Sequence, residues 1–227
     1  VIEDSAFSGC IALESIDLPA RIETIGGSAF ENCTALKAVV MPDSLTEIGG
    51  FVFKNCTSLS EVTISKGLTV LPAALFSGCT SLENIDIPDS MQIMEGGVVE
   101  NCTALKELII PDSVTELGWG FAEGCEYLEK VKLPSGLTEV PTYAFHNCYR
   151  LTDIEIPDSV QRIWPRAFQY CESLEKINIP EGITELEETT FSNCHSLKEV
   201  TLPESLTSVG EYAFSDCYSL ESISIPD

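Results

Sequence analysis

The sequence predicts a repeat solenoid of about ten coils, each 23 residues long, with a parallel β-sheet on its concave face and short helical or 3₁₀ turns and loops elsewhere. Fixed periods of roughly 20–50 residues are typical of arrays in which each repeat buries its apolar face only against its neighbours. Ten cysteines recur every 23 residues without insertion, at Cys10, Cys33, Cys56, Cys79, Cys102, Cys125, Cys148, Cys171, Cys194 and Cys217. A leucine lies three residues after each of these cysteines, from Leu13 to Leu220.

The segment after each leucine is predicted to be a short strand. Aliphatic residues lie six and eight positions after the cysteine, as Ile154 and Ile156 do after Cys148, and this is the two-residue period of a strand. Proline takes the ninth position in nine coils, with Ser65 as the exception, and ends the strand because it has no N–H to donate. The Asp-Ser or Ser-Gly pair that follows is typical of a turn.

The remainder of each coil is predicted to combine a turn with a second extended segment. Residues 29–36 and their equivalents space apolar groups by three, which favours a helical or 3₁₀ turn. Residues 45–48 and their equivalents favour a second short strand, and stacking places equivalent strands about 4.8 Å apart. In coil five Val99 replaces the usual phenylalanine, and in coil six Phe121 comes one position early. We therefore expect a local change in packing there.

The unbroken period predicts one solenoid domain over residues 1–227. Neither end shows the polar cap that solenoids need, so we expect a fragment of a longer chain, truncated at both ends. The 36 acidic residues outnumber 12 basic ones, and the formal net charge is −24. Nucleic acid and anionic membranes are therefore poor partners. We also expect no direct membrane insertion, because no apolar run is long enough to span a bilayer.

The repeated columns resemble those of the BspA-like leucine-rich repeat proteins, the 23-residue TpLRR class of bacterial repeats. The matching pattern is Ile-Gly-x-x-Ala-Phe-x-x-Cys-x-x-Leu-x-x-Ile-x-Ile-Pro-x-Ser. It stands here almost literally from Ile25 to Ser44, with Val39 and Met41 at the last two isoleucine positions. The resemblance covers the whole chain and implies a solenoid of leucine-rich repeat type. It further implies a secreted or cell-surface location and a role in adhesion or matrix binding. It brings no catalytic residues to this chain.

The cysteines are predicted to form a ladder of buried thiols. Each coil offers one cysteine between Phe and Leu at core spacing, whereas a metal site needs several ligands that converge. Neighbouring cysteines lie about 5 Å apart between Cα atoms, which is within disulfide range. Their parallel Cβ vectors disfavour pairing, however, so we expect all ten to be reduced and unreactive.

No enzyme, cofactor or metal centre is predicted. The two histidines, His146 and His195, lie two coils apart in different columns, which gives a catalytic triad little support. Asn-Cys-Thr sequons occur in several coils, such as the one at Asn32. We interpret their asparagines as residues that close a turn, in preference to glycosylation sites. Acidic residues recur directly after the conserved proline, and their exposed carboxylates repel one another. A loosely bound cation would relieve this repulsion, so weak calcium binding is a hypothesis. The column comprises Asp89 beside Asp112, and Asp158, Glu181 and Glu204 in succession.

The outward residues five and seven positions after each cysteine are predicted to line the concave face. One half of this face alternates in charge, along Glu107, Lys130, Asp153, Lys176 and Glu199. Opposite charges on neighbouring strands then neutralise one another, so we expect this half to be structural. The other half is less charged and partly apolar. Its candidate ligand-binding residues are Val40, Thr63, Asp86 and Ile109.

Aromatic residues outside the core columns form the second candidate group, comprising Trp119, Tyr127, Tyr143 and Tyr149. Tryptophan and tyrosine are enriched at binding hot spots, although covering the loops of neighbouring coils is an alternative role. The leading hypothesis is an extracellular or cell-surface interaction or adhesion module. It would bind a host or matrix protein or a glycan through its concave face and loop rim. The alternative is a structural spacer that presents another domain and has no ligand of its own.

Overall fold

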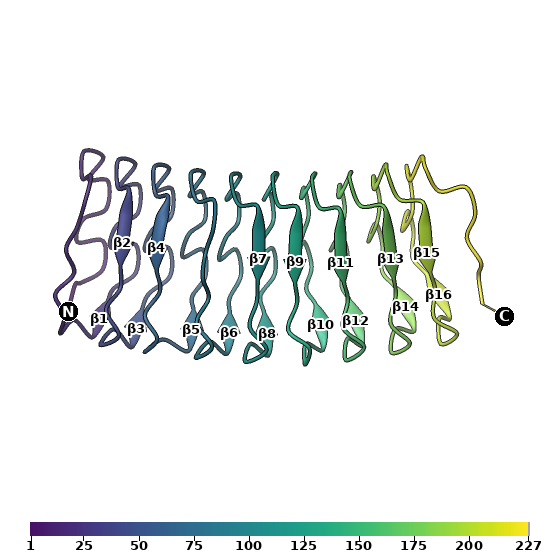
Figure 1. Cartoon of the computed structure of the whole chain (residues 1–227), viewed down its shortest axis with the longest axis horizontal. Helices are drawn as coiled ribbons and strands as arrows, with labels where there is room; N and C mark the ends of the chain where they lie inside the picture. Colours follow the sequence, from purple (N-terminus) through teal and green to yellow (C-terminus); the bar gives the residue numbers. More distant parts are fainter. Residues whose placement is uncertain (227) are drawn as a thin grey trace.

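The computed structural model describes residues 1–226 as a parallel β-solenoid whose coils lie side by side along the long axis, with the two termini at opposite ends (Figure 1). We number the coils 1 to 10 by the cysteine that each contains, from Cys10 to Cys217. Strand pairing follows the sequence period, because each residue pairs with the residue 23 positions later, as Ala38 does with Glu61. The predicted solenoid with parallel sheets is confirmed.

The first sheet is built from three-residue strands that lie after the leucine of each coil (Figure 1). The central residue of each strand points inward and the two flanking residues point outward, as the buried Val131 between exposed Lys130 and Lys132 shows. We call the outward side of this sheet the β face. Its strands are β2 (Ala38–Val40), β4 (Glu61–Thr63), β7 (Glu107–Ile109), β9 (Lys130–Lys132), β11 (Asp153–Glu155), β13 (Lys176–Asn178) and β15 (Glu199–Thr201).

A second sheet of two-residue strands runs along another side of the solenoid (Figure 1). It confirms the second extended segment predicted for residues 45–48. Its strands are β1 (Thr24–Ile25), β3 (Glu47–Ile48), β5 (Val70–Leu71), β6 (Ile93–Met94), β8 (Glu116–Leu117), β10 (Glu139–Val140), β12 (Arg162–Ile163), β14 (Glu185–Leu186) and β16 (Ser208–Val209).

The first sheet is discontinuous. Of the ten predicted coils, seven form a strand there, and coils 1, 4 and 10 do not within residues 1–226. The break in coil 4, at residues 84–86, separates β4 from β7. It follows Ser65, the residue that replaces the strand-ending proline in coil 3. This serine is buried, and its hydroxyl donates to the carbonyl of Leu45 at 2.8 Å and accepts from the N–H of Gly67 at 3.0 Å.

The segment predicted as a helical or 3₁₀ turn forms separate hydrogen-bonded turns, and no helix occurs in residues 1–226. In coil 2 the N–H of Cys33 donates to the carbonyl of Phe30 at 3.2 Å, and the N–H of Leu36 donates to Cys33 at 3.0 Å. Asn32 lies inside the first of these turns with a φ of 60°. A left-handed residue at this position stops the turns from propagating into a right-handed helix.

Each coil repeats this left-handed geometry twice. The residue just before each cysteine has a positive φ in all ten coils, and it is Asn or Gly in eight of them. These types adopt the left-handed region at least cost, which agrees with an asparagine that closes a turn. The residue five positions before each cysteine also has a positive φ, although it is a bulkier residue such as Tyr143 or Arg166 in several coils.

The thiol ladder is confirmed as a structural element of the core. All ten cysteines are free, and those from Cys33 to Cys194 are buried. Each thiol from Cys33 onward donates to a backbone carbonyl of the preceding coil at 3.1–3.4 Å. Burial raises the pKa of Cys56 and of Cys125 to about 12, which keeps these thiols protonated. Cys10 is exposed, so the expected lack of reactivity does not extend to it.

Stacked phenylalanines form a second ladder, which is interrupted in the middle of the array. Neighbouring rings from Phe7 to Phe76 stack with centroids 5.2–5.8 Å apart. Coil 5 places Val98 and Val99 in the core instead, and Phe121 then meets Phe145 edge-on at 78°. The expected change in packing is present.

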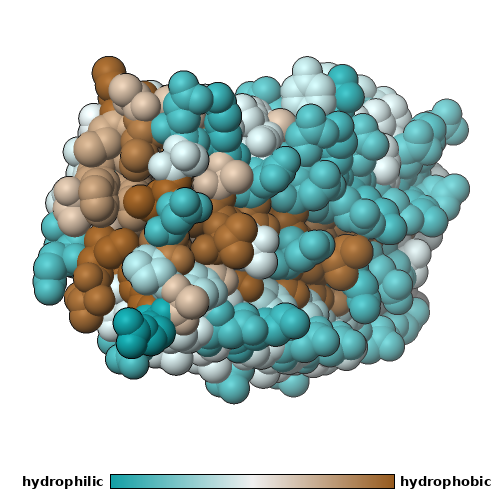
Figure 2. Space-filling view, turned by 60° about the vertical axis from the view of Figure 1, so that its left-hand side comes forward, coloured by the Kyte–Doolittle hydropathy of each residue, from teal (hydrophilic) through white to brown (hydrophobic). Residues whose placement is uncertain are grey.

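Figure 2 shows apolar side chains gathered on the end coil that contains the N-terminus, while polar residues dominate the rest of the view.

Candidate binding surfaces

The four candidates of the concave face lie in one column of the β face, seven positions after each cysteine of coils 2 to 5. Thr63 is the register partner of Val40. Val40 is 64% exposed and Ile109 is 50% exposed. The structure thus brings Val40, Thr63, Asp86 and Ile109 together as a row of outward side chains across four consecutive coils.

Two shallow hollows flank the sheet break within this row. One has a volume of about 190 Å³ and is lined by residues that include Thr63, Lys66 and Asp86. The other, of about 200 Å³, is lined by residues that include Asp86, Glu107 and Ile109. Three of the four candidates therefore border a surface depression, as expected for a contact surface and not for an enclosed small-molecule site.

The second half of the β face carries the alternating charges. Lys130 bonds to Glu107 at 2.7 Å, and it also pairs in register with Asp153. Lys176 pairs in register with Glu199 across β13 and β15. A hollow of about 310 Å³ lies over this region, lined mostly by polar and charged side chains. Opposite charges on adjacent strands offset one another here, as predicted.

A neighbouring column holds further ion pairs that the sequence interpretation missed. Four positions after the cysteine, Lys37 bonds to Glu14 at 2.6 Å and Lys106 bonds to Glu83 at 2.6 Å. The hydrogen bond from the lysine lowers the pKa of each of these glutamates. The sequence does contain a signal for these ion pairs, because the charge changes sign between residues 23 positions apart.

The four aromatic candidates lie away from the β face, at two different edges of the solenoid. Trp119 and Tyr143 follow β8 and β10, where the second sheet leads into the turns. Tyr127 and Tyr149 follow the cysteines of coils 6 and 7, where the turns lead into the first sheet. Burial, followed by the charge of Glu126, raises the pKa of Tyr149. The eight candidates therefore occupy three surfaces instead of one.

Arginines engage two of these four aromatic side chains. The Arg150 guanidinium lies 4.2 Å from the centre of the Tyr127 ring. Arg166 donates to the Tyr143 hydroxyl at 2.6 Å. Each pair joins adjacent coils, and such contacts stabilise a surface by about 0.5–2 kcal/mol. The sequence interpretation missed these arginines, although each lies 23 residues after its tyrosine. For Tyr127 and Tyr143 the structure favours the alternative role of covering neighbouring coils.

Each histidine lies beside a glutamate of the preceding coil. His146 Nδ1 lies 3.1 Å from a Glu123 carboxylate oxygen, and His195 Nδ1 lies 3.8 Å from Glu172. Among residues 1–226, no three His, Cys, Asp or Glu side chains are grouped so that they could hold a metal ion. Within the same residues, no helix has the length and apolar character needed to cross a membrane.

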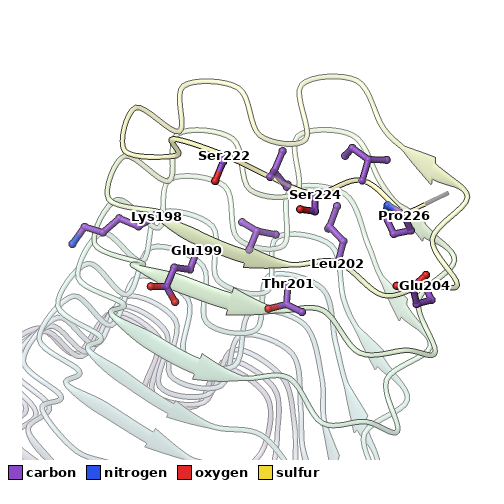
Figure 3. Close-up of a pocket in the computed structure, with 11 residues that line it drawn as sticks. Lys198, Glu199, Thr201, Leu202, Glu204, Ser222, Ser224 and Pro226 are labelled. Atoms are coloured by element: carbon purple, nitrogen blue, oxygen red, sulfur yellow. The ribbon is translucent and has the colours of Figure 1, made fainter.

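Another hollow, of about 590 Å³, lies between β15 and residues 222–226. Figure 3 shows Lys198, Glu199 and Thr201 on its β15 side and Ser222 and Ser224 across from them. It contains none of the eight candidate residues.

A parallel sheet of 23-residue coils over a leucine ladder defines a leucine-rich repeat solenoid. The family model for the BspA type leucine-rich repeat region matches residues 1–129 and 119–227, so the chain belongs to this family. A comparison with curated proteins finds no match.

Solved bacterial structures share the fold. A leucine-rich repeat protein from Bacteroides ovatus is 31% identical, with a TM-score of 0.61 over 96% of this chain and 68% of the other. One from Eubacterium ventriosum is 17% identical, with a TM-score of 0.69 over 99% and 82%. A leucine-rich cell-surface protein from Faecalibacterium prausnitzii is 24% identical, with a TM-score of 0.52 over 88% and 76%.

Proposed function

We propose that this chain is a non-catalytic protein-interaction module, displayed at the cell surface or secreted, which binds a protein through the β face of coils 2 to 5. The observation that carries the proposal is the exposure of Val40 and Ile109 on a sheet face that also has two hollows. A flat, partly apolar sheet surface suits contact with another protein, because aliphatic groups there gain from being removed from water.

The family and its solved relatives support an interaction role. A Faecalibacterium prausnitzii protein of the same fold is described as a cell-surface protein, and an extracellular location for this chain follows as part of the proposal. A host or matrix protein is the proposed partner class, and adhesion is the biological role it implies. The edge residues Tyr127, Tyr143 and Tyr149 remain proposed contacts of secondary weight, because arginines or burial already engage them.

Binding to immobilised matrix proteins, such as collagen, fibronectin and laminin, tests the proposal. A Val40→Ser/Ile109→Ser double variant removes the apolar surface of the first half. The matched control, Asn178→Ser/Thr201→Ser, changes the same column in coils 8 and 9. We expect saturable binding of the wild-type chain that the first variant weakens by about tenfold or more, as for contacts at the centre of an interface.

The spacer role makes the opposite prediction. A spacer would bind none of these proteins, and its β-face variants would behave like the wild type. Equal loss in both double variants would also count against a site in coils 2 to 5. A Trp119→Ala/Tyr143→Ala double variant then shows whether the edge residues contribute to the same contact.

A further inference from the structure

The break in the first sheet at residues 84–86 leaves backbone polar groups without partners in the chain. In coil 2 the N–H that follows the strand, that of Met41, donates to the carbonyl of Thr63 at 3.0 Å. Within residues 1–226, no backbone hydrogen bond of this kind is made by residues 84–86. These residues also line the hollow of about 200 Å³ on the β face. Because polar backbone groups need hydrogen-bonding partners, this hollow is suited to a ligand that supplies them.

Asp86 adds an uncompensated negative charge to this surface. Its side chain is exposed, and no ion pair of Asp86 is found within residues 1–226. The other carboxylate of the hollow, that of Glu107, is already bonded to Lys130 at 2.7 Å. Lys66 lines the hollow of about 190 Å³ on the side of coil 3, but in the described part of the chain no ion pair joins it to Asp86. Asp86 therefore lies in the candidate row without a cation of this chain to balance it.

The second half of the β face has a similar break with a cation beside it. The first sheet is also interrupted between β11 and β13, and the hollow of about 310 Å³ there is lined by residues that include Asp153, Lys176 and Glu199. Lys176 lies in register with Glu199. In coils 2 to 5, by contrast, neither outward column of the β face contains a lysine or an arginine. The first half thus lacks the cation that the chain itself supplies in the second half.

We propose that the partner bound by the β face of coils 2 to 5 is a basic protein segment. It places a lysine or arginine side chain beside Asp86 and aliphatic side chains over Val40 and Ile109. The inference rests on the proposed function and names the chemistry of its partner. Lysine has three N–H donors, arginine has five, and neither has an acceptor, which suits a hollow bordered by a carboxylate and unpaired backbone carbonyls. The formal net charge of −24 adds a long-range attraction for a cationic segment.

Other occupants suit this surface less well. A neutral or acidic segment would leave Asp86 unpaired at a contact that excludes water, and an unpaired buried charge is strongly unfavourable. A metal ion needs several converging ligands, and no suitable group of three is found within residues 1–226. A small organic cation would leave Val40 and Ile109 exposed to water, whereas a protein segment covers them and gains from their burial.

Labelled peptides test the inference through fluorescence anisotropy at low and high salt. The probe is an N-acetylated, C-amidated peptide of sequence Val-Val-Arg-Arg-Val-Val, and its analogues carry glutamine or glutamate in place of both arginines. We expect saturable binding of the arginine peptide that salt weakens. The glutamine peptide should bind at least about tenfold more weakly, as for the loss of a central contact, and the glutamate peptide should not bind. Equal binding of the arginine and glutamine peptides, or no binding of either, would overturn the inference.

Two variants of equal net charge separate a local contact from the general attraction of an acidic protein. Asp86→Asn should weaken binding of the arginine peptide by about tenfold or more, as for a contact at the centre of an interface. Glu155→Gln, which changes the same column in coil 7, should weaken it less than twofold because Glu155 lies in register with Lys132. Equal losses in the two variants would leave only long-range attraction and would overturn the site at Asp86.

The same variants distinguish failure of this inference from failure of the proposed function. Loss of matrix-protein binding in both Asp86→Asn and the Val40→Ser/Ile109→Ser double variant, together with competition by the arginine peptide, would support both. Loss in the double variant alone, without competition by the peptide, would leave the protein contact in place and overturn the basic segment. Peptide binding that persists in both variants would place the peptide elsewhere on the molecule and would also overturn the inference.

Discussion

The two halves of the β face have the same interior and opposite surfaces. In the column five positions after the cysteine, lysines alternate with carboxylates from coil 5 to coil 9, as Lys130 does between Glu107 and Asp153. In the column seven positions after the cysteine, Val40 and Ile109 are exposed in coils 2 to 5, where coils 6 and 7 carry Lys132 and Glu155. The first sheet is interrupted in both halves, at residues 84–86 and between β11 and β13. The inward columns are nearly identical throughout because each coil must fill the same space. The outward columns are free of that constraint, so their differences indicate where the molecule makes contacts outside itself.

The largest expected effect tests the claim that the interior is equivalent in the two halves. Leu105→Ala in coil 5 and Leu174→Ala in coil 8 should each lower the free energy of unfolding by about 2–5 kcal/mol, because both leucines are fully buried and leave cavities. Urea unfolding measures the effect. The control is Lys132→Ala, whose exposed side chain should contribute about 0–1 kcal/mol. A Leu105→Ala cost no larger than that of the control would refute the assignment of inside and outside.

Alkaline pH should weaken both halves through the thiol ladder. Burial raises the pKa of Cys56 and Cys125 to about 12, compared with about 8.5 in an unfolded chain. The stabilisation is complete below about pH 8.5 and is lost as the pH rises toward 12, by about 1.4 kcal/mol per pH unit for each thiol. At pH 10 this amounts to about 2 kcal/mol per thiol.

Single replacements isolate this contribution in each half. Cys56→Ala and Cys125→Ala should lower stability at neutral pH, yet each should make the decline of stability between pH 8.5 and 10 shallower by the same amount. Urea unfolding across this range provides the slopes. An unchanged slope in both variants would show that other groups, such as tyrosines and lysines, cause the alkaline decline.

The interior of the fold was largely predictable because the period repeats ten times and each column has one role. The leucines and cysteines of coils 2 to 9 were assigned to the core correctly, whereas Cys10 is exposed. The turn around Asn32 was predicted as helical or 3₁₀ because apolar groups recur every three residues. The hydrogen-bonded turn is present, but spacing alone does not reveal the positive φ that prevents a helix. The break at residues 84–86 was not predicted either, since this segment keeps the same apolar pattern as its neighbours.

The candidate surfaces were only partly predictable, because pairing between side chains depends on geometry. The row from Val40 to Ile109 follows directly from the two-residue period of a strand. The engagement of Tyr127 by Arg150 instead depends on rotamers at a coil edge. The place of Trp119 over Gly96 depends on the absence of a side chain in the preceding coil. A comparison of residues 23 positions apart would have paired Tyr127 with Arg150. Such a comparison does not reveal whether an aromatic ring is covered or exposed.

Reversing one charge should affect the two halves unequally. Lys130→Glu removes the ion pair with Glu107 and places a third carboxylate between Glu107 and Asp153. Two like charges 5 Å apart in water repel by about 0.8 kcal/mol, so we expect a loss of about 1 kcal/mol at low salt. Thr63→Glu in the first half breaks no ion pair and should cost less. Thermal unfolding at low salt should show a larger loss of stability for Lys130→Glu than for Thr63→Glu. At about 1 M salt, where the Debye length falls to about 3 Å, the two variants should lose equally little.

The smallest expected effect concerns calcium at the acidic column of the second half. Asp158, Glu181 and Glu204 are exposed, while in the first half Asp43 and Asp112 already accept backbone N–H groups at 3.1 and 2.8 Å. Calcium takes six to eight oxygen ligands, and no group of three acidic side chains suited to a metal is found in residues 1–226. Any site is therefore weak, and a dissociation constant of about 10 mM gives only about 0.4 kcal/mol of stabilisation at 10 mM calcium. Calorimetry and the melting temperature measure it, with Asp158→Asn/Glu181→Gln as the variant that should abolish the shift. Magnesium is the control for simple screening of charge, and an equal shift with both ions would refute a calcium site.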